Sequence, residues 1–151
     1  MKTTGTHYKT KTATENEIFA HLTACSDTFI PPLAHRVNIN EYARKIFVKS
    51  VTFEAWAAGH SDLVGCVATY FNDPTNSIAF ITSVSVLDKF VGRGIASHLL
   101  KMCIEYARKN HFREIKLEVD DQNSGAIGLY KKLGFTVYDT KGNLLLMRRQ
   151  T

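Results

Sequence analysis

The chain has 151 residues, of which 44% are hydrophobic and 22% charged, and its formal net charge is +5. This composition is typical of a soluble globular protein, and the length suits one domain over residues 1–151 with a flexible start at residues 1–7. No apolar run approaches the roughly 20 residues of a membrane span, and no basic stripe with interleaved aromatic residues indicates a nucleic-acid binder. We therefore expect neither a membrane nor a nucleic acid as partner, whereas the positive charge suits a polyanionic small ligand.

The cysteines and histidines give information on the cellular compartment and on metal binding. Cys25, Cys66 and Cys103 each lie in an apolar setting, which is typical of reduced, buried thiols. These thiols, together with a polar amino terminus that lacks the apolar core of a signal peptide, indicate a cytoplasmic protein. The six histidines are scattered without metal-ligand spacing, so we expect no metal site.

The amino-terminal third predicts one short strand and two helices. Weak alternation favours a strand over residues 8–13. Thr14 and Glu17 match a capping box, which opens a helix that should end before the prolines at 31 and 32. Asn40 is expected to cap the second helix.

The middle of the chain predicts an antiparallel meander. Strands are expected over residues 52–57 and 63–71, joined by a turn at 58–62, and a second turn at 72–76 leads into a strand at 78–86.

The carboxyl-terminal half adds a parallel connection and a last hairpin. A helix over residues 94–109 precedes a strand at 114–119, and the strands on either side of this helix should be parallel. A further helix runs from the cap Asn123 to Gly134, and a hairpin follows over residues 135–148. The fold class is therefore α/β (α+β), a single domain with a mixed sheet.

Residues 81–100 combine a strand, a glycine-containing turn and the start of a helix. Gly92 and Gly94 let the backbone approach a ligand closely, and Lys89 and Arg93 add positive charge. A helix N-terminus leaves N–H groups unpaired and carries about half a positive charge, so this turn favours phosphate binding. The alternatives are an ordinary strand–helix turn and, more weakly, a dinucleotide fingerprint, which would need a small residue in place of Ser97.

Three motifs in this order resemble those of one family. Lys89-Phe90-Val91-Gly92-Arg93-Gly94 matches Gln/Arg-x-x-Gly-x-Gly/Ala except for lysine in the first place. An asparagine followed by an Ala-x-x-Leu-Tyr-x-x-x-Gly-Phe run appears as Asn123, Ala126, Leu129, Tyr130, Gly134 and Phe135. The strand around Glu118 completes the set. Over roughly residues 8 to 149 the chain resembles the GNAT superfamily of acetyl-CoA-dependent N-acetyltransferases, and Leu117-Glu118-Val119 is similar to its RimI-like branch.

The resemblance implies a mostly antiparallel sheet whose parallel central strands splay apart around acetyl-CoA, the co-substrate. The turn backbone would bind the pyrophosphate, and the exposed edge of the strand at 84–86 would pair with the pantetheine amides as an added strand would. The residues implied to bind the cofactor are Val84, Ser85, Val86, Lys89, Phe90, Val91, Gly92, Arg93, Gly94, Ile95, Ala96, Ser97, Asn123 and Tyr130.

The implied reaction is direct attack of a primary amine on the thioester in a ternary complex. An alkyl ammonium has a pKa near 10, so it needs a base, and Glu118 is the candidate, acting through a water. Tyr130 is the candidate acid for the thiolate, and a backbone N–H near Val84 would stabilise the oxyanion. The alternatives are a salt-bridged Glu118 and a Tyr130 that only packs in the core.

The acceptor is expected between the first helices and the last hairpin. The implied lining residues are Phe29, Ile30, Pro31, Pro32, His35, Arg36 and Tyr42. The partner is a small-molecule amine or a peptide amino terminus, with a homodimer as a further expectation. Alternatives from other classes are a non-catalytic acyl-CoA-binding or regulatory module and an RNA- or ribosome-associated protein.

Overall fold

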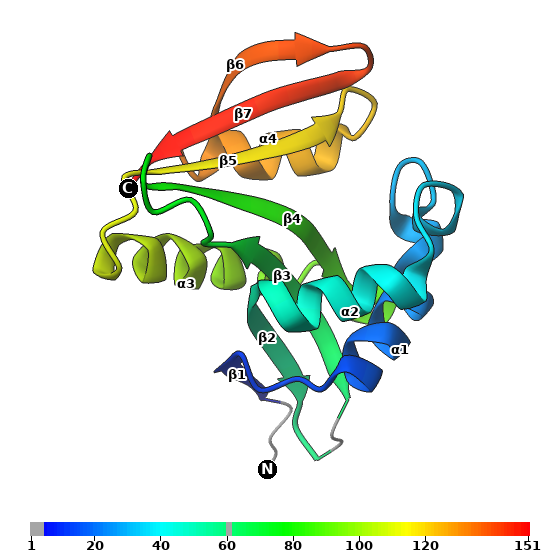
Figure 1. Cartoon of the computed structure of the whole chain (residues 1–151). Coiled ribbons are helices and arrows are strands. Elements are labelled where there is room, and N and C mark those ends of the chain that lie inside the picture. Colours follow the sequence, from blue (N-terminus) through cyan, green and yellow to red (C-terminus); the bar gives the residue numbers. More distant parts are fainter. Residues whose placement is uncertain (1–4, 60–61) are drawn as a thin grey trace.

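The computed structural model describes residues 5–59 and 62–151 (Figure 1). In these ranges the strands are β1 (Thr6–Thr10), β2 (Val51–Ala57), β3 (Leu63–Tyr70), β4 (Ile78–Val86), β5 (Glu114–Asp120), β6 (Thr136–Lys141) and β7 (Leu144–Gln150). The helices are α1 (Glu15–Cys25), α2 (Ile39–Lys49), α3 (Ile95–Lys109) and α4 (Ser124–Lys132), with 3₁₀ turns η1 (Ser26–Thr28), η2 (Leu33–His35) and η3 (Asp88–Phe90). None of the helices described is long and apolar enough to cross a membrane.

The strands form one mixed sheet in the order β1-β2-β3-β4-β5-β7-β6. Neighbouring strands are antiparallel except β4 and β5, which are parallel and are connected through α3. The expected meander, parallel pair and last hairpin are confirmed. The antiparallel β7 lies between β5 and β6, so the carboxyl terminus returns to the middle of the sheet (Figure 1).

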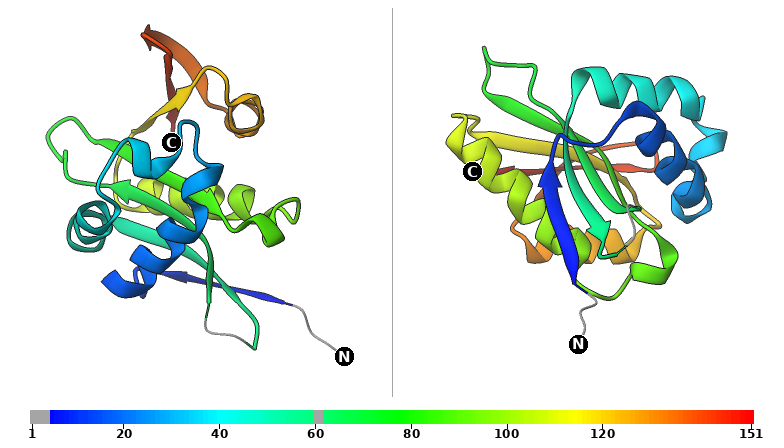
Figure 2. Two further views of the ribbon diagram at one scale, coloured as in Figure 1. Left: turned by 90° about the vertical axis from the view of Figure 1, so that its right-hand side faces the viewer. Right: turned by 90° about the horizontal axis from the view of Figure 1, so that it is seen from below.

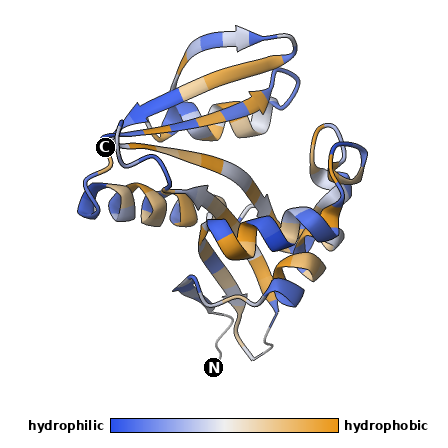
Figure 3. Ribbon diagram, viewed as in Figure 1, coloured by the Kyte–Doolittle hydropathy of each residue, from blue (hydrophilic) through white to orange (hydrophobic). Residues whose placement is uncertain are grey.

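Helices cover both faces of the sheet. α1 and α2 pack on one face and α3 on the other (Figure 2). Successive residues of β3 therefore enter different cores: Val64 and Val67 pack in the α3 core, whereas Leu63 and Cys66 pack in the α1–α2 core. Apolar and polar residues alternate along α2 and α3, as one-sided burial requires (Figure 3).

Helix boundaries follow local capping signals with one correction. The Thr14–Glu17 capping box is present at α1. At α2 the expected cap Asn40 is wrong, because the side chain of Asn38 accepts the Glu41 N–H and Asn40 lies inside the first turn. The sequence offers both asparagines within one turn, so local pattern alone does not separate them.

Part of the expected flexible start forms a strand. β1 begins at Thr6 and ends at Thr10, so residues 6 and 7 of the expected flexible start pair with β2 instead. Residues 1–4 lie outside the described part of the chain. The same holds for His60 and Ser61 in the expected turn at 58–62.

The parallel strands separate halfway along their length. β4 pairs with β5 only from Ile78 to Ile81, although both strands continue beyond this point. On its other side β4 stays paired with β3 as far as Val86. The C-terminal half of β4 therefore has one unpaired edge facing the gap, which is the expected splay (Figure 1).

A β-bulge at Thr82 accompanies this separation. Ala68 and Thr69 are adjacent on β3, but their partners on β4, Ser83 and Ile81, are separated by Thr82. An extra residue reverses the alternation of the side chains after it. Ile81 accordingly packs in the α3 core, whereas Ser85 reaches α1 on the opposite face.

Candidate active site

A cavity of about 400 Å³ lies where β4 and β5 separate. It is lined by residues of the α1–α2 connection, by β4, and by the carboxyl end of β5 with α4: Thr28, Phe29, Ile30, Pro31, Leu33, Arg36, Val37, Tyr42, Phe80, Ile81, Thr82, Ser83, Val84, Glu118, Val119, Asp120, Asn123, Tyr130 and Leu144. Nine residues that the sequence assigned to the site thus meet in one place: Phe29, Ile30, Pro31, Arg36, Tyr42, Val84, Glu118, Asn123 and Tyr130. Among the expected acceptor residues, Pro32 and His35 do not line the cavity: Pro32 precedes η2, and His35 ends η2 and is exposed.

Two carboxylates lie at the carboxyl end of β5. Glu118 is exposed on one side and lines the cavity, and it forms no hydrogen bond or ion pair with the described residues. Asp120 accepts the Gln122 N–H at 2.8 Å through one oxygen and also lines the cavity. Glu118 is therefore free to accept a proton or to bind a cation.

Tyr130 lies on α4 with its ring packed near Phe135. The residue is buried apart from the cavity that it lines, and burial raises the pKa of Tyr130 to about 12. Its phenol thus stays protonated at neutral pH. It has no hydrogen-bond partner among the described residues, which leaves its proton available to a ligand.

Asn123 caps α4 and lines the cavity with the same side chain. Its Oδ1 accepts the Ala126 N–H at 3.3 Å, so the amide oxygen is used by the helix. The amide nitrogen has no partner among the residues that the structure describes, and it can donate to a ligand.

The glycine-containing turn follows β4 and lies beside the cavity rather than in its lining. Gly92 and Gly94 have φ values of 81° and 78°, a region that favours glycine. Gly94 is the N-cap of α3 and provides no side-chain cap. Within the described chain, the backbone N–H groups of residues 92–97 have no hydrogen-bond partner. This run of free donors at a helix N-terminus is suited to a diphosphate.

The cationic side chains of the turn are exposed. Arg93 packs over the Phe90 ring at 4.8 Å and donates to the Lys89 carbonyl at 3.4 Å. Lys89 lies on η3 and is exposed to solvent. Both side chains therefore add positive charge at the surface of the turn, and their contact with phosphate stays a prediction.

Tyr42 connects α2 to the bulge of β4. Its hydroxyl donates to the Thr82 carbonyl at 2.7 Å and lies 2.6 Å from the Thr82 hydroxyl. Burial raises the pKa of Tyr42 to about 12, although the Thr82 hydrogen bond and the charge of Arg36 act in the opposite direction. Tyr42 therefore holds α2 against the cavity floor as a neutral phenol.

Sequence reasoning missed Ser83. It is 5% exposed, lines the cavity, and its hydroxyl has no hydrogen-bond partner in the described structure. Strict alternation would place it on the face of Ile81, in the α3 core, and only the bulge at Thr82 turns it toward α1 and α2. No local signal in the sequence marks this bulge.

Metal binding finds no support in the part of the chain that the structure describes. No group of three or more His, Cys, Asp or Glu side chains is close enough to hold an ion. Cys25, Cys66 and Cys103 are buried and free, as the sequence predicts.

Comparison with known proteins defines the class. The chain belongs to the acetyltransferase (GNAT) family, whose family model matches residues 16–135. The uncharacterized N-acetyltransferase MJ1207 of Methanocaldococcus jannaschii is 40% identical over 91 residues, which are 57% of this chain and 40% of that protein. The N-alpha-acetyltransferase 30 of Saccharomyces cerevisiae is 32% identical over 75 residues, which are 48% of this chain and 42% of that protein. The chain thus spans less than half the length of these curated relatives.

The fold is shared with solved acetyltransferases. The PaiA N-acetyltransferase of Thermoplasma acidophilum, determined in complex with coenzyme A, superposes with a TM-score of 0.74 over 96% of this chain and 99% of that chain. The two sequences are 17% identical, so the likeness concerns the fold alone.

Proposed function

We propose that this protein transfers the acetyl group of acetyl-CoA to a primary amine by direct attack in a ternary complex. The observation that carries the proposal is the cavity at the splay of β4 and β5, which Glu118 of β5 and Tyr130 of α4 both line. Membership of the acetyltransferase family supports it, as do relatives named as N-acetyltransferases.

The chain offers suitable partners for each part of coenzyme A. The free N–H groups of residues 92–97 suit the diphosphate, and the unpaired edge of β4 at 84–86 suits the amides of the pantetheine arm. The free amide nitrogen of Asn123 can donate to the same arm. When bound there, acetyl-CoA supplies an acetyl group activated as a thioester.

Glu118 serves as the base. The acceptor amine must be neutral to attack, and an alkyl ammonium has a pKa near 10, so its proton must be removed at neutral pH. Glu118 has no competing partner within the described structure and accepts this proton directly or through a water.

Tyr130 serves as the acid. As the new N–C bond forms and the C–S bond breaks, Tyr130 donates its phenol proton to the departing sulfur and regains one from solvent. Its raised pKa keeps the phenol protonated until that moment.

The acceptor is a small-molecule amine or a peptide amino terminus. The yeast relative is named an N-alpha-acetyltransferase, which supports the second class. Three reduced cysteines support a cytoplasmic location.

The first experiment follows thiol release from acetyl-CoA over a panel of amino sugars, polyamines, amino acids and short peptides. We expect turnover of one acceptor class, and Tyr130→Phe should lower kcat by about 10- to 1000-fold with little change in the Kd for acetyl-CoA, because it removes a proton and little volume. Glu118→Gln should lower kcat to a similar degree. Micromolar acetyl-CoA binding without turnover of any amine would favour a non-catalytic acyl-CoA-binding module instead.

A further inference from the structure

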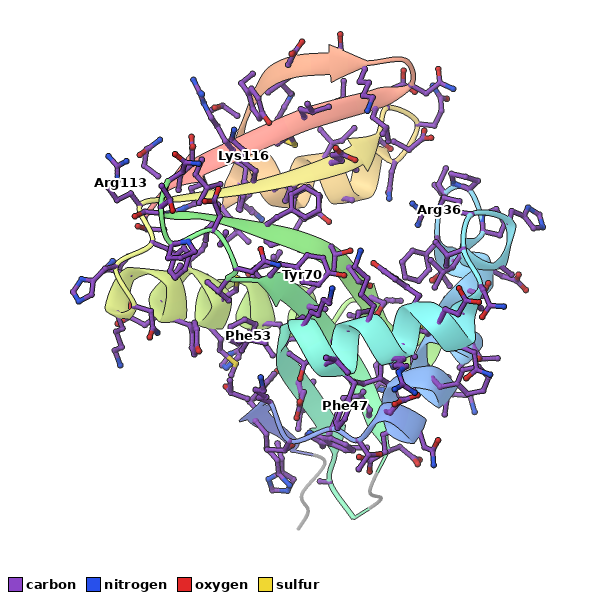
Figure 4. The ribbon with its side chains drawn as sticks, in the orientation of Figure 1. Arg36, Phe47, Phe53, Tyr70, Arg113 and Lys116 are labelled. Carbon is purple, nitrogen blue, oxygen red and sulfur yellow. The ribbon has the colours of Figure 1, made fainter. Side chains whose placement is uncertain are left out.

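The charges around the cavity are distributed unequally. Glu118 and Asp120 lie at its β5 end, whereas Arg36 lies on the connection between α1 and α2. Figure 4 places Arg36 on this connection, on the side of the molecule where β5 ends. Among the described residues that line the cavity, Arg36 is the only cation.

Arg36 is exposed and its charge is not neutralised. Its guanidinium carbon lies 5.7 Å from the centre of the Phe29 ring, a contact that leaves its hydrogen-bond donors free. Within the described structure Arg36 forms no ion pair and no side-chain hydrogen bond. A planar guanidinium with five free donors can bind a carboxylate through two parallel hydrogen bonds.

Ser83 gives a second, independent indication of a polar ligand. Its hydroxyl is buried and unpaired in the floor of the cavity, on the face that α1 and α2 cover. Buried hydroxyls are paired in nearly all proteins, so one that is unpaired and aimed into a cavity indicates a partner supplied by the ligand.

We infer that the acceptor is an amine whose own molecule carries a carboxylate, with the amine at Glu118 and the carboxylate bound by Arg36. This inference rests on the proposed function, because it assigns the substrate class of the same site. It also disfavours polyamines, since a second ammonium would face the guanidinium. A free amino acid and a peptide that begins with Asp or Glu share the required chemistry.

Matched acceptors test the inference by thiol release from acetyl-CoA. One series pairs free amino acids with their carboxamides, and a second pairs peptides beginning with Asp or Glu with peptides beginning with Asn or Gln. We expect kcat/KM to be about tenfold or more higher for the carboxylate member in one series, which identifies the source of the carboxylate.

Variants of Arg36 isolate its part in that preference. Arg36→Gln should raise KM for the carboxylate member about tenfold, leave kcat within about threefold, and remove the preference, while Arg36→Lys should retain part of it. Arg113→Gln is the matched control, because Arg113 is exposed and lies at the far side of the molecule (Figure 4).

The outcomes distinguish this inference about the acceptor from the proposed acetyl transfer on which it rests. Turnover of amines with equal kcat/KM for carboxylate and amide members, or a preference that survives Arg36→Gln, overturns the inference and leaves acetyl transfer standing. Preferred turnover of polyamines overturns it as well. Absence of turnover with every amine overturns the proposed function and, with it, the acceptor class inferred here.

Discussion

Two serines of β4, Ser83 and Ser85, are almost equally buried but differ in hydrogen bonding. Ser85 lies 2.9 Å from His21 Nε2, whereas the Ser83 hydroxyl has no partner in the described structure. The two positions therefore separate the cost of losing a hydrogen bond from the cost of losing an unpaired hydroxyl. At the first, substitution removes the hydroxyl partner of His21 Nε2; at the second, it removes a polar group that the ligand-free protein does not use.

We expect Ser83→Ala to change the free energy of unfolding by less than about 0.5 kcal/mol, or to raise it, because no hydrogen bond is lost. Ser85→Ala should lower it by about 1–3 kcal/mol, since a buried histidine nitrogen loses its partner. Urea denaturation of both variants without ligand measures the difference. Equal destabilisation by the two substitutions would mean that Ser83 has a partner within the protein.

The turn between β4 and α3 contains two glycines that packing does not require. A Cβ at Gly92 or Gly94 would meet no atom within 4 Å, so packing does not require glycine there. Glycine is needed there for the positive φ and for close approach of a ligand to the backbone. By contrast, Gly65 is favoured by packing, because a Cβ there would lie 2.8 Å from Ile95 Cγ2 and 3.3 Å from Leu99 Cδ1 on α3.

Gly92→Val should therefore abolish acetyl-CoA binding, because it strains the turn and blocks approach of the diphosphate. Gly142→Val is the matched control: Gly142 also has a positive φ and open space around it, but lies in the β6–β7 hairpin. Both variants should lose about 1–2 kcal/mol of stability from the backbone conformation. Isothermal titration with acetyl-CoA should show loss of binding for Gly92→Val alone; an unchanged Kd would remove the turn from the site.

At the scale of the whole molecule, buried polar groups connect segments that are distant in the chain. Glu54 of β2 is fully buried and accepts hydrogen bonds from Thr12, Ala13, Thr52 and Trp56, which ties the segment between β1 and α1 to the sheet. His21 of α1 donates from Nδ1 to the Leu63 carbonyl at 2.9 Å, so Nε2 is the nitrogen that accepts from Ser85. These groups fix α1, and with it the α1–α2 wall of the cavity, against β3 and β4.

The His21 contact makes global stability depend on pH. Burial lowers the pKa of His21 to about 4 from an ordinary value of 6.5, because the charged imidazole is disfavoured between α1 and the sheet. A lowered folded-state pKa gives stability that is complete above about pH 6.5 and is lost as the pH falls toward 4. The expected loss over this window is up to about 3 kcal/mol.

Urea unfolding between pH 7 and pH 4.5 measures this dependence. In His21→Gln the part of the slope due to His21 should vanish, although the variant starts from a lower stability. His35→Gln is the control, since His35 is exposed and should leave the slope unchanged. An equal slope in wild type and His21→Gln would contradict the assignment.

The sequence by itself determined the features that depend on neighbouring residues. The Thr14 capping box, the Asn123 cap, the glycine turn and the alternating strands are local signals, and together with the spacing of Glu118 and Tyr130 they predicted the order of elements and the family. The parallel pair followed because a helix separates its two strands in the chain.

Only the tertiary structure decided which side chains share the cavity. The bulge at Thr82 has no local signature, because it arises where β4 must stay paired with β3 while leaving β5. This bulge turns Ser83 into the cavity, and the docking of α1 brings Arg36 there while leaving its neighbour His35 outside. Such placements depend on contacts between residues forty or more positions apart, which no short window of sequence contains.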